Sequence, residues 1–310
     1  MKLETASLRC IFLALIIGFS FANPTLAQHR SLDMDLGVVR IYFSEEGQVD
    51  GLTLDASNEF LSYQIDDIRS FESLKTLYIV EGDLRRQDAQ ALSEIKSLRK
   101  VVLQLPSRRT VSIFLENEQI NSMFIGDLHI SNEMMNRFKE SENLTSFAFG
   151  NCTFDELVTG AWSPKNRVVF RNSKLPAGFL EGAENNFSQL EIDRCELDPS
   201  NFEFIKNCEL LRLVDAGLTD DHLSLIIGNN PALKGLGISI NLGITDQSGV
   251  ELSNLEELEW LTANSTRIAG GTARELLKMK SLGLVEARGT SIPLDMLKKL
   301  QHLFPANENR

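Results

Sequence analysis

The stretch that decides the fold is residues 187–197, FSQLEIDRCEL. Counted from Phe187, apolar side chains occupy positions 1, 4, 6 and 11, and Cys195 occupies position 9. The alternation from position 3 to position 7 predicts a short β-strand. Positions 4 and 6 of this strand face a core, and positions 3 and 5 face away from it. One copy buries little apolar surface, so a stable fold needs neighbours of the same kind.

The same spacing recurs on both sides of this stretch. Residues 144–154, LTSFAFGNCTF, fit the pattern equally well, and earlier copies begin at Leu74, Leu98 and Ile120. Later copies begin near residues 208, 233, 258 and 282. A repeat length of about 21–25 residues is typical of a solenoid in which each repeat stacks on the next.

This pattern resembles the motif of leucine-rich repeat proteins, over about residues 49–304. Leu218-Thr219-Asp220 and Ile244-Thr245-Asp246 place helix N-caps after the strand, as in the ribonuclease-inhibitor-like class and many exported bacterial repeat proteins. The resemblance implies an α/β leucine-rich repeat solenoid of about ten repeats. A curved parallel sheet would form its concave face, and helices and turns its convex face.

Some copies depart from the pattern. Residues 104–119 carry Pro106 and two arginines, and Trp162-Ser163-Pro164 interrupts a later return segment. We expect shorter turns there instead of regular helices. Leu294, Leu297, Leu300 and Phe304 predict an amphipathic helix that closes the C-terminal end of the solenoid.

Residues 1–27 have the pattern of a signal peptide. Lys2 and Arg9 precede or flank an apolar run at residues 10–21, and cleavage is expected after Ala27 or Ala22. We therefore expect an exported protein, either periplasmic or secreted. The alternative is that the segment remains as an uncleaved N-terminal membrane anchor. No later segment is apolar enough to span a membrane. Residues 28–48 are expected to contain a capping strand, and residues 305–310 to form a polar tail.

The net charge and the cysteines limit the classes of partner and of chemistry that we expect. A net charge of -12 argues against nucleic acid or an anionic membrane as the main partner. After removal of the signal peptide, Cys152, Cys195 and Cys208 remain. Cys152 and Cys195 lie two repeats, about 10 Å, apart, which exceeds the reach of a disulfide. We expect all three to be reduced thiols packed in the core.

No catalytic, metal or cofactor motif stands out. The four histidines belong to no metal-ligand pattern, and the chain has no nucleophile elbow and no phosphate-binding glycine loop. His222 follows two aspartates that are better explained as helix-capping residues. We therefore expect a protein that is not an enzyme and has no cofactor.

The residues at position 5 of each copy should run down the centre of the concave face. In chain order this column comprises Tyr78, Val102, Phe124, Ala148, Val169, Glu191, Arg212, Gly237, Thr262 and Glu286. Its first half is apolar and aromatic, and its second half is polar. Arg99, Lys100, Arg167 and Arg171 would surround the apolar half with positive charge.

Exposed apolar patches tend to mark interaction sites, and aromatic anchors often dominate their energetics. The predicted site for a protein or peptide partner comprises Tyr78, Arg99, Val102, Phe124, Val169 and Arg171, with Trp260 as a separate contact. The same column is also compatible with a face that binds nothing. β-propensity alone favours such side chains in strands, loops could cover this face, and an error of one residue in register would turn the column inward.

Two classes of function fit these observations. The first is an exported binding scaffold that recognises a partner on its concave face, as the resemblance implies. The second is a structural or envelope-assembly protein that self-associates through its edges or convex side. The oligomeric state does not follow from the sequence.

Overall fold

The computed structural model describes residues 38–58, 61–156, 162–183 and 187–301. The predicted signal peptide, the start of the capping region and the polar tail lie outside these ranges, as does Phe304. No helix in the described ranges is long and apolar enough to cross a membrane.

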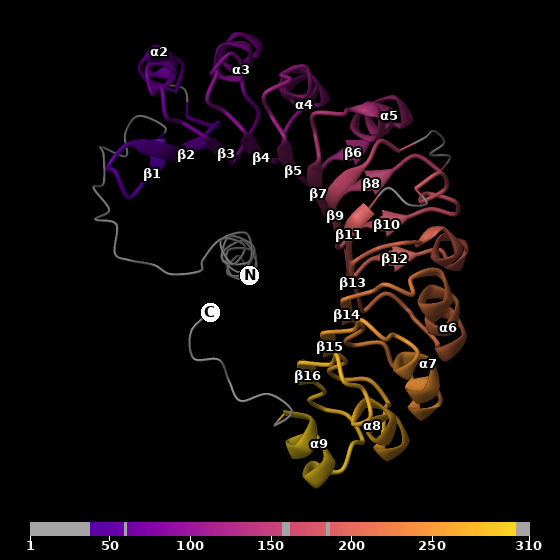
Figure 1. Cartoon of the computed structure of the whole chain (residues 1–310). Coiled ribbons are helices and arrows are strands. Elements are labelled where there is room, and N and C mark those ends of the chain that lie inside the picture. Colours follow the sequence, from indigo (N-terminus) through magenta and orange to yellow (C-terminus); the bar gives the residue numbers. More distant parts are fainter. Residues whose placement is uncertain (1–37, 59–60, 157–161, 184–186, 302–310) are drawn as a thin grey trace, which may run out of the picture.

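A single 12-stranded sheet forms the scaffold. Figure 1 shows it lining the inner side of a curved molecule, with the helices on the outer side. From β2 onward all neighbouring strands are parallel, and β1 is antiparallel to β2. The predicted α/β leucine-rich repeat solenoid is confirmed. The strands are β1 (Val38–Phe43), β2 (Val49–Asp55), β3 (Thr76–Val80), β4 (Lys100–Gln104), β5 (Ser122–Gly126), β7 (Ser146–Gly150), β9 (Lys165–Arg171), β11 (Phe187–Asp193), β13 (Leu210–Val214), β14 (Gly235–Gly237), β15 (Trp260–Thr262) and β16 (Leu284–Glu286).

The return segments form the convex side. Two short parallel pairs join neighbouring returns: β6 (His129–Ile130) with β8 (Thr153–Phe154), and β10 (Lys174–Leu175) with β12 (Glu196–Leu197). The helices are α2 (Ile65–Arg69), α3 (Arg86–Ser93), α4 (Arg108–Leu115), α5 (Asn132–Glu140), α6 (Asp220–Asn229), α7 (Gly249–Ser253), α8 (Gly270–Leu276) and α9 (Leu294–Gln301). Shorter 3-10 turns are η2 (Leu61–Tyr63), η3 (Pro199–Phe204) and η4 (Asp246–Ser248).

Capping residues explain where these helices begin. Thr219 accepts a hydrogen bond from the His222 amide at 3.4 Å and starts α6, as the Thr-Asp pattern predicts. The expectation of an irregular return at residues 104–119 is wrong, because α4 forms there. Pro106 lies before the helix, where it blocks no helical hydrogen bond, and Ser107 is the N-cap. Asp83 of the preceding repeat accepts from the Ser107 amide at 2.9 Å and joins the two repeats.

The strand pattern places the core as predicted. In β3, Leu77 and Ile79 at positions 4 and 6 are buried, and Tyr78 between them is partly exposed. Cys152, Cys195 and Cys208 are free and buried, which confirms the prediction for the thiols. Burial raises their pKa values to about 12, 11 and 12, respectively. They are therefore protonated and packed at neutral pH.

Two lysines lie inside this core. Lys165 occupies position 1 of its copy, where the pattern calls for leucine, and its side chain is 2% exposed. Its Nζ donates a hydrogen bond to the Ser141 carbonyl oxygen. Lys139 is also buried, with Nζ 4.8 Å from the centre of the Trp162 ring. Burial lowers the pKa of each lysine to about 8, because a low-dielectric interior disfavours the charged form.

From β3 onward, each strand of the 12-stranded sheet is followed by a residue in the left-handed region, at position 8 of the copy. The set comprises Glu81, Leu105, Asp127, Asn151, Asn172, Arg194, Asp215, Ile240, Ser265 and Gly289. This conformation turns the chain out of the sheet towards the convex side at the same point of every repeat. Ile240 has φ 63°, which is costly for a β-branched side chain.

A buried asparagine joins repeats in the C-terminal half. Asn241, at position 9, is 1% exposed. Its Nδ2 donates to the carbonyl oxygens of Leu213 at 2.7 Å, Ile238 at 2.9 Å and Ser239 at 3.2 Å. Its Oδ1 accepts from the amides of Ala216 and Leu218, both at 3.0 Å. One side chain thus satisfies buried backbone groups in two successive repeats.

Candidate functional site

The predicted central column exists as a continuous row in register. Each position-5 residue pairs with the next across neighbouring parallel strands, from Tyr78 in β3 to Glu286 in β16. The register that the sequence suggested is therefore correct. The sheet lines the inner curve of the molecule (Figure 1), and positions 4 and 6 are buried on its other side, so the alternation of the strand places position 5 on the concave side.

The N-terminal part of the row is aromatic but only partly open. Tyr78 and Phe124 are partly exposed, whereas Val102, which lies between them in the register, is 3% exposed. The Tyr42 ring of β1 lies 5.7 Å from the Tyr78 ring and extends the aromatic surface. Tyr42 lies outside the repeat pattern and had no signal in the sequence, because the antiparallel pairing of β1 with β2 places it there. We call Tyr42, Tyr78 and Phe124 the aromatic strip.

Three strands away from Phe124 in the sheet lies a cluster of charges around Glu191. The Glu191 carboxylate accepts from Arg171 at 2.7 Å and from Arg167 at 3.1 Å, and Arg212 lies 3.6 Å away. Burial alone would raise the pKa of Glu191, but the hydrogen bond and charge of Arg171 and the charge of Arg212 lower it overall. Val169, between Arg167 and Arg171 on β9, is 5% exposed. Val102 and Val169 therefore form part of the floor of this face and offer little surface for contact.

The two basic residues that follow Leu98 have different environments. Arg99 donates through Nη1 to the carbonyl oxygens of Lys96 at 2.7 Å and Leu98 at 2.9 Å. It also lines a hollow at the strand-entry edge that contains Asp50 and Glu72, so it lies beside the strip rather than on it. Lys100, at position 3 of β4, is partly exposed on the concave side. Lys100 was among the basic residues expected to surround the apolar patch, and it lies nearer the centre of the concave face than Arg99 does.

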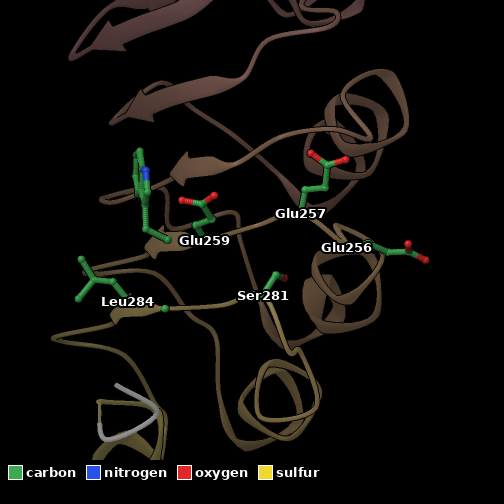
Figure 2. A pocket seen from close by; sticks show the side chains of 7 residues that line it. Glu256, Glu257, Glu259, Ser281 and Leu284 are labelled. Atoms are coloured by element: carbon green, nitrogen blue, oxygen red, sulfur yellow. The ribbon is translucent and has the colours of Figure 1, made fainter. Parts of the chain in front are cut away.

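Trp260 lies on a separate surface, as expected. In the register it is six strands from Phe124, or about 29 Å along the sheet. Its indole covers Gly235, because a Cβ added to that glycine would lie 2.1 Å from Trp260 Cε2. A shallow pocket is lined by Trp260, Ser281, Gly283, Leu284 and three glutamates, Glu256, Glu257 and Glu259. Figure 2 shows Glu259 and Leu284 beside the strands and Glu256 and Glu257 nearer the helices.

The charges divide the concave face into two halves. Positions 2, 3, 5 and 7 of β3, β4, β5, β7 and β9 carry no acidic residue, and their basic residues are Lys75, Arg99, Lys100, Arg167 and Arg171. The same positions of β11 to β16 carry five acidic residues, Glu191, Asp193, Glu209, Glu259 and Glu286, and three basic residues, Arg212, Lys234 and Arg288. We call these surfaces the basic half and the acidic half.

Among the described residues, no group of three or more His, Cys, Asp and Glu side chains is arranged to hold a metal ion. The arrangement on the concave face is one of aromatic rings, charged groups and hydroxyls at an open surface, which suits recognition of another molecule.

No family model matches the chain, and no curated protein matches it in sequence. Among solved structures, the chain is similar to an internalin from Listeria monocytogenes, with 12% identity and a TM-score of 0.46, over 83% of this chain and 88% of that one. It is also similar to a structure of the Rad7 and Elc1 complex in yeast, with 13% identity and a TM-score of 0.46, over 79% of this chain and 77% of that one. Likenesses at this level do not extend to function.

Proposed function

We propose that this chain, whose fold is that of a leucine-rich repeat solenoid, is a non-catalytic exported scaffold that binds a protein or peptide partner on its concave face. The observation that carries the proposal is the aromatic strip. Tyr78 and Phe124 point away from the core and are partly exposed, so packing of the interior does not require them. Aromatic side chains at such positions are frequent anchors of protein interfaces.

The remaining predicted residues take different roles in this proposal. Val102 and Val169 support the surface from below, and Arg171 holds Glu191 in place at 2.7 Å. Arg99 borders the site at the strand-entry edge, and Trp260 offers a second contact for a partner that follows the sheet. Export is supported by the apolar run at residues 10–21.

The test is affinity capture from a native extracellular or envelope extract with purified wild-type protein as bait. We expect a partner that wild type retains and Phe124→Asp loses, because a buried charge without a partner is costly at an interface. Thr262→Asp is the matched control, since Thr262 occupies the same position of the repeat in the acidic half. Retention of the partner by Phe124→Asp would contradict a site on the aromatic strip.

A second candidate is self-association through the convex side. Leu225 of α6, Val250 of α7 and Leu294 of α9 are all exposed on that side. Capture of only the protein itself, abolished by Val250→Glu and unaffected by Phe124→Asp, would favour this structural role.

A further inference from the structure

Two serines lie between two basic residues on the basic half. At position 3, Lys100, Ser122, Ser146 and Arg167 follow one another across β4, β5, β7 and β9 in register. Neither serine hydroxyl makes a hydrogen bond with any residue that the structure describes. Both serines are partly exposed. The row therefore presents two available hydroxyl donors between two cationic side chains.

The positive charge around these serines is not balanced. Within the described ranges, Lys100 makes no ion pair. Burial lowers the pKa of Lys100 first, and the positive charge of Arg167 lowers it further. On the other side, Glu191 contacts Arg167, Arg171 and Arg212, and Asp193 also lies 4.0 Å from Arg171.

An apolar surface adjoins this position. Phe124 and Ala148, at position 5 of β5 and β7, lie two residues beyond Ser122 and Ser146. Two residues of an extended strand cover about 7 Å. A ligand group over the serines would therefore lie close to a second group resting on Phe124.

From this placement we infer that the basic half binds an acidic segment of the partner. One carboxylate would lie over Ser122 and Ser146 between Lys100 and Arg167, with a neighbouring apolar side chain on Phe124. This inference rests on the proposed function and adds the chemistry of the partner. The acidic half would favour the same segment less, since its outward positions carry five acidic and three basic residues.

The size of the surface sets the length of the segment. From β3 to β9 the sheet spans four strand spacings, or about 19 Å, which about six extended residues cover. A short linear stretch of a partner is thus sufficient, and no folded acidic domain is needed.

The test uses a fluorescent peptide of alternating glutamate and leucine, about eight residues long, and its counterpart with lysine for glutamate. We expect the purified protein to bind the glutamate peptide at least about 10-fold more tightly than the lysine peptide, with the difference shrinking at high salt. Lys100→Glu should weaken binding of the glutamate peptide about 10-fold or more. Ser146→Glu, which supplies a carboxylate from the chain itself, should also weaken it. Because it places this carboxylate directly across from Arg167, it should do so without loss of thermal stability.

Lys234→Glu is the matched control for charge reversal. Lys234 lies on β14's strand-entry side in the acidic half, 3.9 Å from Glu209, and its reversal should change peptide affinity less than about two-fold, since it lies beyond a Debye length from the site. Equal binding of both peptides, or no binding of the glutamate peptide, would overturn the inference.

The native partner separates this inference from the proposed function. If Phe124→Asp loses the captured partner but Lys100→Glu retains it, the concave face binds a partner whose acidic groups play no part. If both variants retain the captured partner, the result contradicts the proposed function itself.

Discussion

The two halves of the sheet share one interior and differ on their outward face. In β3, Leu77 and Ile79 fill the core, and Leu211 and Leu213 do the same in β13. At the outward position between them, however, β3 has Tyr78 and β13 has Arg212. Burial constrains the inward positions equally in every repeat. The outward positions are free of that constraint, so the differences among their side chains are the part of the molecule that carries information about a partner.

Individual repeats also differ in how they are joined to their neighbours, although this difference does not follow the two halves, because Cys195 is at position 9 in the acidic half. At position 9 the acidic half contains Asn241, whose amide hydrogen-bonds to five backbone groups. The corresponding residue of the basic half, Cys152, contributes a weak thiol donor 3.5 Å from the carbonyl oxygens of Ile125 and Gly150. Hydrogen bonds stabilise the junction at Asn241, whereas packing stabilises the junction at Cys152.

The largest effect should come from breaking the polar junction. Asn241→Ala leaves buried amides and carbonyls without partners and should lower the free energy of unfolding by about 3–5 kcal/mol. Urea denaturation of the purified protein measures it. Cys152→Ala, at the same position of its repeat, is the control and should cost about 1–2 kcal/mol. Similar costs for both variants would show that the two junctions do not differ in kind.

A smaller effect should come from the lysine inside the basic half. The later copies have Cys208, Leu233, Leu258 and Leu282 at position 1, where this copy has Lys165. Because burial lowers the folded-state pKa of Lys165 to about 8, below its ordinary value, folding disfavours the charged form at pH 7. Lys165→Leu should therefore raise the free energy of unfolding by about 2 kcal/mol at pH 7.

The pH dependence of this gain tests its cause. The folded protein releases the Lys165 proton near pH 8, and the unfolded chain releases it near 10.5. The penalty is thus complete below about pH 8 and fades as the pH rises towards 10.5, so the advantage of Lys165→Leu should shrink across this window. The buried cysteines contribute equally to both proteins. An advantage that stays constant from pH 7 to pH 10 would show that packing, and not charge burial, explains it.

The smallest effect concerns the left-handed residues after the strands. Ile240 in the acidic half is 47% exposed, and Leu105 in the basic half is similarly open, so replacement of either sacrifices little buried surface. Ile240→Asn should raise the free energy of unfolding by about 1 kcal/mol, because asparagine tolerates this conformation and a β-branched side chain does not. Leu105→Asn should raise the free energy of unfolding by a smaller amount. Thermal denaturation of both variants gives the order, and a destabilised Ile240→Asn would reveal an apolar contact of the exposed side chain.

Much of the fold could be predicted from the repeat pattern. The strands, their register and the buried cysteines follow from alternation over five residues and its recurrence. The helix α4 could not be predicted in the same way, because Pro106 suggested a break. Its start depends on Asp83 of the preceding repeat, which accepts from the Ser107 amide. A contact between repeats of this kind leaves no periodic signal in the sequence.

The candidate site was predictable in position and less so in character. Tyr78 and Phe124 followed from the position-5 column, but the burial of Val102 and Val169 depends on their neighbours across and along the strands. Tyr42 and the Glu191 cluster depend on side chains that meet across strands.

The sequence alone determined which side chains face the core and which face outward, since that alternation is a local property of an extended backbone. Only the tertiary structure decided which outward-facing groups meet. Lys100 and Arg167 are three repeats apart along the chain, and stacking of parallel strands brings them to either side of Ser122 and Ser146. Such proximity is set by the register and curvature of the whole sheet, and no short stretch of sequence contains it.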